Sequence, residues 1–175
     1  MIYKFRMISG DETAFLREYE VDSNTTFLNF HNFIQKDLEF DSNQLASFFL
    51  ADEQWNKGME LTLIDMENDA GPAAIPMDSL KINDLLKNKK ERLLYVFDIF
   101  SERCFFIELS NIFQKEDDVT YPRCIASIGN APEQVVVEEV SIEDIFSDEE
   151  TLNEIINDIG LSDTDINPDD YFDKD

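Results

Sequence analysis

The sequence holds few side chains that catalyse reactions or bind metals, and His31 stands out as the chain's single histidine. An imidazole in an apolar setting, oriented by the Gln35 amide one helical turn later, could act as a general base or a metal ligand. The structural alternative is a core histidine that donates a hydrogen bond to Gln35 or to a backbone carbonyl. We expect the structural role.

Cys124 is a second candidate because Arg123 precedes it, and a neighbouring cation lowers the pKa of a thiol. Nucleophilic catalysis would also require His31 within hydrogen-bond reach, which the spacing does not indicate. We expect an inert thiol, either buried or held in a loop.

Asp98 is the third candidate, since it interrupts an apolar, strand-like run. A carboxylate in such surroundings pairs with a cation, is solvated, or has a shifted pKa. The structural interpretation is an ion pair with Arg92, Arg103 or Arg123.

A metal centre usually needs three or four ligands, so it would require His31, Cys104, Cys124 and Asp98 to converge. The acidic runs lack the glycine and the final glutamate of a calcium-binding loop. The glycine-rich phosphate-binding motifs and the nucleophile elbow are also absent from the sequence. We therefore expect neither a cofactor nor a bound metal, and we assign no catalytic residue.

The element that must position His31 is a helix, predicted over about residues 25–38. At 100° per residue one apolar stripe contains Phe27, Phe30, His31, Ile34 and Leu38. The short polar side chains of residues 22–25 are typical of a helix N-cap.

Strand patterns flank this helix on both sides. Alternating or continuous apolar residues predict strands at 2–8, 15–21, 45–50, 59–64, 92–99, 104–109 and 135–137. A short helix is expected within 77–86, and an irregular loop at 121–124. The predicted fold class is α+β, with a mostly antiparallel sheet built from hairpins, the main helix packed on it, and an acidic helical C-terminal extension.

The composition is that of one domain with an appendage. The chain has 175 residues, 43% of them hydrophobic, and its two cysteines form no disulfide framework. It has no secretory leader pattern and no apolar run of the roughly 18–20 residues that a membrane span needs. We expect a soluble cytoplasmic protein.

The formal net charge of −25 is the most unusual property of the sequence. Affinity for nucleic acid rests on neutralising phosphates with Lys and Arg, so direct binding of DNA or RNA is disfavoured. Anionic membranes are disfavoured for the same reason. Basic proteins and cations are the partners that the long-range field attracts, although acidity also simply keeps a protein soluble.

Acidic residues dominate the end of the chain, where Lys174 is the only basic residue after Glu138. We predict two parts, a domain over residues 1–140 and an acidic C-terminal extension over 141–175. A helical stripe within the extension contains Leu152, Ile155, Ile156 and Ile159. The extension is either a helix that docks on the chain's own core or a solvated arm that orders on a partner.

Several spaced motifs together resemble the plasmid pRi ORF-3-like family, whose members are also labelled insertion-element passenger proteins. The first is the strand motif Tyr3-Lys4-Phe5. The helix motif consists of Thr26, Phe27, Phe30, His31, Ile34 and Gln35. A strand-pair motif begins at residues 97–100, and the loop motif consists of Tyr121, Pro122, Arg123, Cys124, Ala126, Pro132 and Glu133. The resemblance covers roughly residues 1–140 and leaves out the acidic end.

The chain is a degenerate member of that family by this comparison. The family's Gly-Asp-x-Trp-x-His is replaced by residues 100–105, its His-Leu by Gln44-Leu45, and a second loop cysteine by Ala131. Its Pro-Pro-x-Ile-Trp-Arg segment is absent from the first hairpin. The resemblance implies an α+β fold with helices on a mostly antiparallel sheet, and it implies little about activity. A resolvase label associated with the family would need a basic DNA-binding surface, which this chain lacks.

Our leading hypothesis is a non-enzymatic interaction or accessory protein that engages a basic or apolar protein partner through residues 141–175. The competing hypothesis is a small enzyme or metal-binding protein that uses His31, Cys124 and Asp98 in one cleft. A third is acidic mimicry of nucleic acid, which needs charges laid along one face. The sequence does not predict an oligomeric state, a ligand or a substrate.

Overall fold

β-Strands dominate the part of the chain that the structure describes. The computed structural model describes residues 1–10, 14–63 and 74–135, which belong to the compact unit Met1–Val135. Strands make up 44% of these residues and helices 12%. The predicted α+β class is therefore wrong, because the protein is mostly β, with one eight-stranded sheet and two helices in the described ranges.

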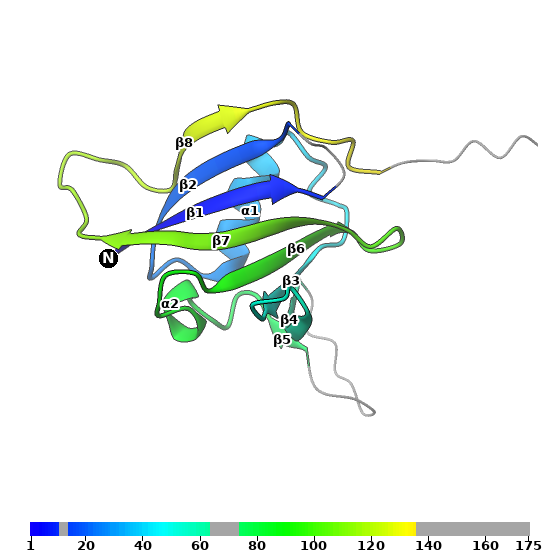
Figure 1. The fold of residues 1–175 in the computed structure, drawn as a ribbon, viewed down its shortest axis with the longest axis horizontal. Helices are drawn as coiled ribbons and strands as arrows, with labels where there is room; N and C mark the ends of the chain where they lie inside the picture. The colour runs from blue at the N-terminus through cyan, green and yellow to red at the C-terminus, as the bar shows by residue number, and fades with distance from the viewer. Residues whose placement is uncertain (11–13, 64–73, 136–175) are drawn as a thin grey trace, which may run out of the picture. The chain divides into compact units, whose positions relative to one another are not determined.

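The sheet is mostly antiparallel, and its strand order is β5-β4-β3-β6-β7-β1-β2-β8 (Figure 1). The strands are β1 (Ile2–Ser9), β2 (Leu16–Asp22), β3 (Ser47–Ala51), β4 (Lys57–Thr62), β5 (Ile75–Pro76), β6 (Arg92–Asp98), β7 (Arg103–Phe113) and β8 (Arg123–Ile128). The predicted hairpins β1–β2, β3–β4 and β6–β7 are all present. Among the strands that the structure describes, the one parallel pairing joins β4 to β5.

The first strand of the chain lies inside the sheet. β1 pairs with β2 on one side and with β7, about a hundred residues later, on the other. Its side chains alternate, so Tyr3, Phe5 and Met7 are buried in the core while Lys4 and Arg6 face away from it.

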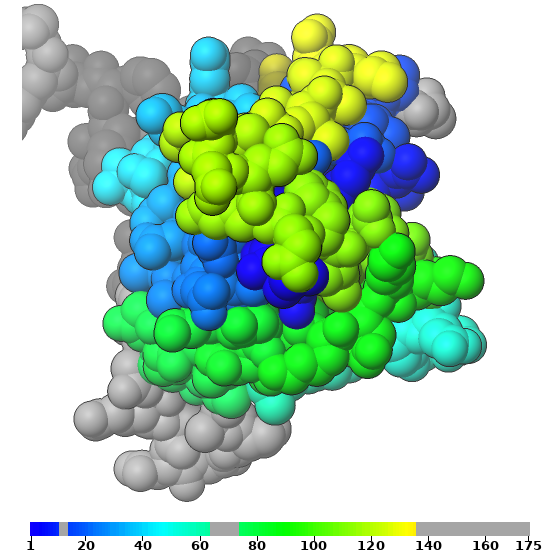
Figure 2. Space-filling model, turned by 90° about the vertical axis from the view of Figure 1, so that its left-hand side faces the viewer, coloured from blue at the N-terminus to red at the C-terminus, as the bar shows by residue number. Residues whose placement is uncertain are grey.

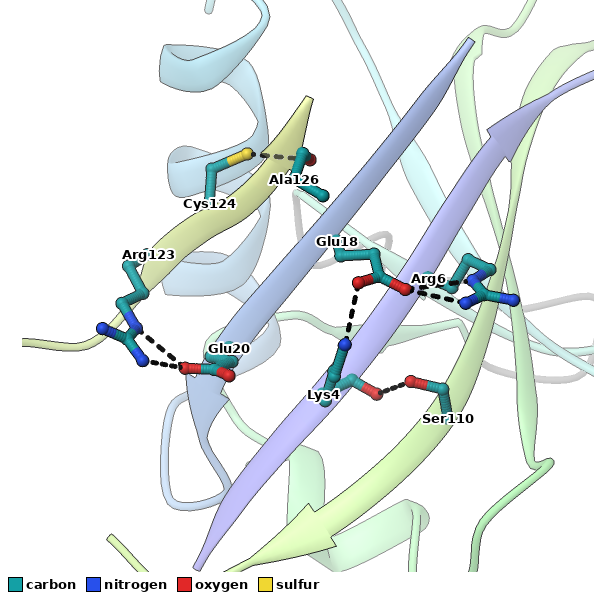
Figure 3. A network of polar contacts seen from close by, with 8 residues as sticks. All are labelled: Lys4, Arg6, Glu18, Glu20, Ser110, Arg123, Cys124 and Ala126. Carbon is teal, nitrogen blue, oxygen red and sulfur yellow. Dashed lines mark hydrogen bonds and ion pairs between the residues drawn. The ribbon is translucent and has the colours of Figure 1, made fainter. Parts of the chain in front are cut away.

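The outward face of β1, β2 and β8 carries cross-strand ion pairs, as Figure 3 shows. Glu18 accepts from both Lys4 and Arg6, at 2.8 and 2.9 Å, and these contacts lower the pKa of Glu18. Opposite charges facing each other across strands support this register.

One helix, α1 (Phe27–Asp37), lies against the sheet behind β1, β2 and β7 in the view of Figure 1. Its N-cap is Thr26, whose side chain accepts a hydrogen bond from the Asn29 amide at 3.2 Å. The Phe30 ring lies 5.0 Å from the Phe5 ring, 5.7 Å from Phe48 and 6.4 Å from Tyr19. This aromatic packing joins α1 to β1, β2 and β3.

A second, four-residue helix, α2 (Ile82–Leu85), follows a segment tied to the start of α1. The Phe27 amide donates to the Leu80 carbonyl, and the Ile82 amide donates to the Thr25 carbonyl. These backbone bonds hold the N-terminal end of α1 in place. His31 lies one turn further along the helix.

Residues 121–124 depart from the sequence prediction of an irregular loop. Arg123 and Cys124 begin strand β8, which pairs antiparallel with β2 at the edge of the sheet. The local sequence does not indicate this pairing because its partner strand lies about a hundred residues earlier. Of the predicted strand at 135–137, Val135 is described and is not in a strand, while residues 136–137 and the predicted helical extension lie outside the described residues.

Neither helix in the described ranges is long and apolar enough to cross a membrane.

The aromatic packing around Phe30 gives a test of the fold. Phe30→Ala would remove a fully buried ring that contacts three other aromatic rings, so it should lower the free energy of unfolding by about 3–5 kcal/mol. The matched control is Phe100→Ala, because Phe100 is 95% exposed and its loss should change that free energy by about 0.5 kcal/mol or less. Urea unfolding followed by tryptophan fluorescence measures both, and equal losses would contradict this packing.

Candidate functional site

His31 lies in the second turn of α1 and is buried against β6. Its Nδ1 atom is 2.7 Å from the hydroxyl oxygen of Tyr95. The Gln35 side-chain amide donates to the same hydroxyl oxygen at 2.6 Å. The three side chains form a buried polar cluster in an otherwise aromatic interior.

The hydrogen bonds indicate how His31 is protonated. Since Gln35 donates to the Tyr95 oxygen, the Tyr95 hydroxyl hydrogen points to His31 Nδ1, which accepts it. The imidazole is then neutral, with its proton on Nε2. Burial lowers the pKa of His31 to about 4 and raises the pKa of Tyr95, so both groups stay uncharged at neutral pH.

The buried cluster connects to the end of the described chain. The Gln134 side-chain amide lies 3.4 Å from Gln35 Oε1 and donates to the Asp41 carbonyl at 3.0 Å. The Asp41 backbone amide in turn donates to Gln134 Oε1 at 2.6 Å. Gln134 therefore holds the end of the described chain against the loop that follows α1 through its hydrogen bonds with Asp41.

Cys124 lies on β8 opposite Tyr19 of β2. Its thiol donates to the Ala126 carbonyl at 3.3 Å, whereas Arg123 reaches back to Glu20 with two nitrogen–oxygen distances of 2.7 Å (Figure 3). Burial and the nearby Asp37 carboxylate raise the pKa of Cys124. The neighbouring arginine is thus bound to a carboxylate, and the thiol is not activated by it.

A second polar cluster lies near Cys124, at the C-terminal end of α1. The Tyr19 hydroxyl donates to Asp37 at 2.8 Å, and the Arg17 guanidinium lies 3.6 Å from the same carboxylate. Burial and this acceptor raise the pKa of Tyr19. Arg17 also donates to the carbonyls of Leu16, Ile128 and Gly129, which ties β8 to β2.

The segment between β7 and β8 lies beside α1, as the yellow-green atoms of Figure 2 show. Phe33 and Lys36 of α1 and Tyr121 and Pro122 line an open hollow of about 560 Å³ there. The Tyr121 hydroxyl is buried and has no hydrogen-bond partner among the described residues. Asp37 also lines this hollow, whereas Cys124 does not.

Asp98 ends β6 and is 6% exposed. Its Oδ1 atom accepts from the Ser101 amide at 3.1 Å, and its Oδ2 atom lies 3.9 Å from Arg103. The expected arginine neighbour is thus Arg103. The Oδ2 atom is buried and accepts no hydrogen bond from any described residue.

The structure does not bring the three predicted site residues together. Asp98 is on β6 and Cys124 is on β8, with β7, β1 and β2 between them. Four strand spacings of about 4.8 Å separate these strands by roughly 19 Å. His31 contacts β6 at Tyr95, three residues or roughly 10 Å along the strand from Asp98. Within the described ranges, no three acidic, cysteine or histidine side chains are grouped so that they could hold a metal ion.

Sequence reasoning missed Tyr95, Tyr19 and Arg17. Tyr95 lies in the apolar run of β6, where an aromatic residue is expected simply to fill the core. A buried imidazole needs a hydrogen-bond partner inside the protein, and the phenol of a tyrosine on a facing strand can be that partner.

Comparison with known proteins gives a family and one informative structure. The family model described as plasmid pRiA4b ORF-3-like protein matches residues 2–154, which confirms the resemblance drawn from the motifs. A crystal structure of a protein of unknown function from Methanosarcina mazei Go1 is similar, with 23% identity and a TM-score of 0.61. The match covers 98% of this chain and 93% of that one. At this identity the likeness concerns the fold alone. No curated protein matches the sequence.

The buried state of His31 predicts a dependence of stability on pH. The pKa of His31 is about 6.5 in the unfolded chain and about 4 in the folded chain, so the unfolded chain binds the proton first as the pH falls. Between pH 7 and pH 5 this should cost roughly 2 kcal/mol of unfolding free energy. His31→Gln cannot titrate and should lose that much less. Urea unfolding of both chains at pH 7, 6 and 5 is the measurement, and parallel losses would contradict the assignment.

The environment of Cys124 predicts a slow thiol. A raised pKa leaves less thiolate, and partial burial limits access, so Cys124 should react with iodoacetamide several-fold more slowly than glutathione at pH 7.5. The measurement uses the Cys104→Ser chain, in which Cys124 is the single thiol. A rate above that of glutathione would show an activated nucleophile.

Proposed function

The chain belongs to the plasmid pRiA4b ORF-3-like protein family, and we propose that it acts as a non-enzymatic protein-interaction module. In this proposal the domain carries an acidic C-terminal arm, residues 141–175, that engages a basic or apolar partner protein. The observation that carries the proposal is the charge of the arm. Thirteen of its residues are Asp or Glu, and Lys174 is its single basic residue.

Electrostatics supports a basic partner. A dense run of like charges attracts an oppositely charged surface and accelerates encounter, and it repels nucleic acid and other acidic proteins. The apolar residues interleaved in the arm, among them Ile142, Ile145 and Phe146, supply contacts that would be buried once a partner is bound. Such an arm combines long-range attraction with short-range burial.

The described domain supports an interaction role over the competing enzyme or metal-binding hypothesis. His31 is neutral and hydrogen-bonded to Tyr95, Cys124 has a raised pKa, and Asp98 lies far from Cys124. Each of the three side chains is engaged in a local contact of the fold. Their separation also leaves them without a common substrate position.

We place the protein in the cytoplasm within the same proposal. What supports this is the sequence, whose two cysteines lie far apart and form no disulfide framework, as is usual in a reducing compartment.

A pair of matched charge variants tests the arm. The arm variant carries Asp148→Asn, Glu149→Gln and Glu150→Gln, and the loop variant removes the same three charges by Glu116→Gln, Asp117→Asn and Asp118→Asn. Tagged full-length chains are used to recover partners from lysate of the source cells, and these are identified and quantified by mass spectrometry. We expect the wild-type chain to recover a protein of net positive charge.

The arm variant should recover that protein several-fold less well, because its attraction is electrostatic, and the loop variant should recover it as the wild type does. Raising the salt concentration from 50 to 500 mM should also release it. Equal recovery by all three chains, or recovery of no basic protein by any of them, would refute the proposed role of the arm.

A further inference from the structure

A pocket of about 210 Å³ opens where β6 ends. Apolar side chains line it on several sides: Leu45 from the loop after α1, Ile99 and Phe100 from the turn after β6, and Val135 from the last described position. Phe100 is 95% exposed, and the other three are between 42% and 51% exposed. Apolar side chains gathered at a pocket and left in water are typical of an interaction site.

Asp98 is the one charged residue that lines this pocket. Its side chain is almost fully buried, yet Oδ2 accepts no hydrogen bond from the described residues. Arg103, 3.9 Å away, directs its Nη1 atom to the Glu133 carbonyl at 2.8 Å and lies over the Phe97 ring. Leaving a carboxylate oxygen buried without a donor is costly, and a bound cation would remove that cost.

The acidic arm begins close to this pocket along the chain. Arg103 holds the Glu133 carbonyl and Gln134 holds Asp41, so Val135 is anchored at the rim. The arm starts six residues after Val135, and six residues of chain reach at most roughly 20 Å. A partner captured by the arm is therefore kept at high effective concentration next to the pocket.

We propose that this pocket docks a lysine-bearing, partly apolar segment of the basic partner. The lysine ammonium binds Oδ2 of Asp98, and apolar side chains next to it pack on Phe100 and Leu45. Oδ1 already accepts from the Ser101 amide, so a single oxygen is available, which suits a compact ammonium better than a bidentate guanidinium. The proposal rests on the proposed function and names the surface and the side chain that it requires.

Isothermal titration of full-length chains with a defined peptide tests this. The probe is a 16-residue peptide of alternating lysine and leucine pairs, and a second peptide carries arginine in place of every lysine. Asp98→Asn keeps the shape of the side chain and removes its charge, and its control is Asp118→Asn, which removes one exposed charge. Phe100→Ser removes an exposed apolar group from the pocket, and its control is Ile128→Ser, because Ile128 is 57% exposed on β8.

We expect Asp98→Asn and Phe100→Ser each to weaken binding of the lysine peptide about tenfold, while both controls bind as the wild type does. The arginine peptide should bind the wild-type chain several-fold more weakly. Unchanged binding by Asp98→Asn and Phe100→Ser, or equal weakening by the controls, would overturn the docking site. Binding of n-butylamine as tight as that of the peptide would also overturn it, since the occupant would then be a small amine.

The two proposals fail separately. Thermal unfolding of each variant confirms that it is folded. If Asp98→Asn does not fold, Phe100→Ser still tests the docking site. Loss of binding in the arm variant but not in the pocket variants would reject the pocket and leave the arm. Loss in the pocket variants with the arm variant unaffected would reject the arm as the source of attraction and, with it, the premise of this proposal.

Discussion

The packing of α1 on one face of the sheet is the constraint on which the rest of the structure depends. An amphipathic helix of three turns has to cover aromatic side chains contributed by several strands, and Phe30 does so by contacting Phe5, Tyr19 and Phe48. Because β1 lies between β7 and β2, residues from both ends of the domain meet under the same helix. Burial of this face supplies the apolar free energy that holds non-local strands together.

That constraint also decides the chemistry of His31. A polar residue on the covered face of α1 must find a partner inside the protein, and His31 finds the Tyr95 hydroxyl, to which Gln35 also donates. The Tyr95 phenol satisfies a neutral imidazole but does not stabilise its cation, so desolvation lowers the pKa of His31. Tyr95 and Asp98 belong to the same strand, β6. Tyr95 lies in the interior, whereas Asp98 ends the strand and lines the surface pocket. The histidine and the carboxylate therefore face different environments.

The elements set by local pattern could be predicted, whereas those set by distant pairing could not. The α1 helix follows from the spacing of Phe27, Phe30 and Ile34 and from its polar N-cap, and the strands of the three hairpins follow from alternating or continuous apolar runs. The β8 strand pairs with β2 across a hundred residues, and β5 is two residues long, so neither leaves a local signal. The fold is mostly β because strands make up 44% of the described residues and helices only 12%. Prediction of the site was limited in the same way. The strand order that separates Asp98 from Cys124 is a property of the whole sheet and not of any local pattern.

Charge bears on where the acidic arm of our proposal would bind. Residues 1–135 contain 13 Lys and Arg against 24 Asp and Glu, so the domain itself is acidic. Many of its cations already face carboxylates, as Arg6 faces Glu18 and Arg123 faces Glu20. An arm that docked on its own domain would bring like charges together and compete with existing ion pairs, which costs free energy at low salt. A basic partner would attract the acidic arm electrostatically and would leave those ion pairs undisturbed. The distribution of charge thus favours binding between molecules over docking within one.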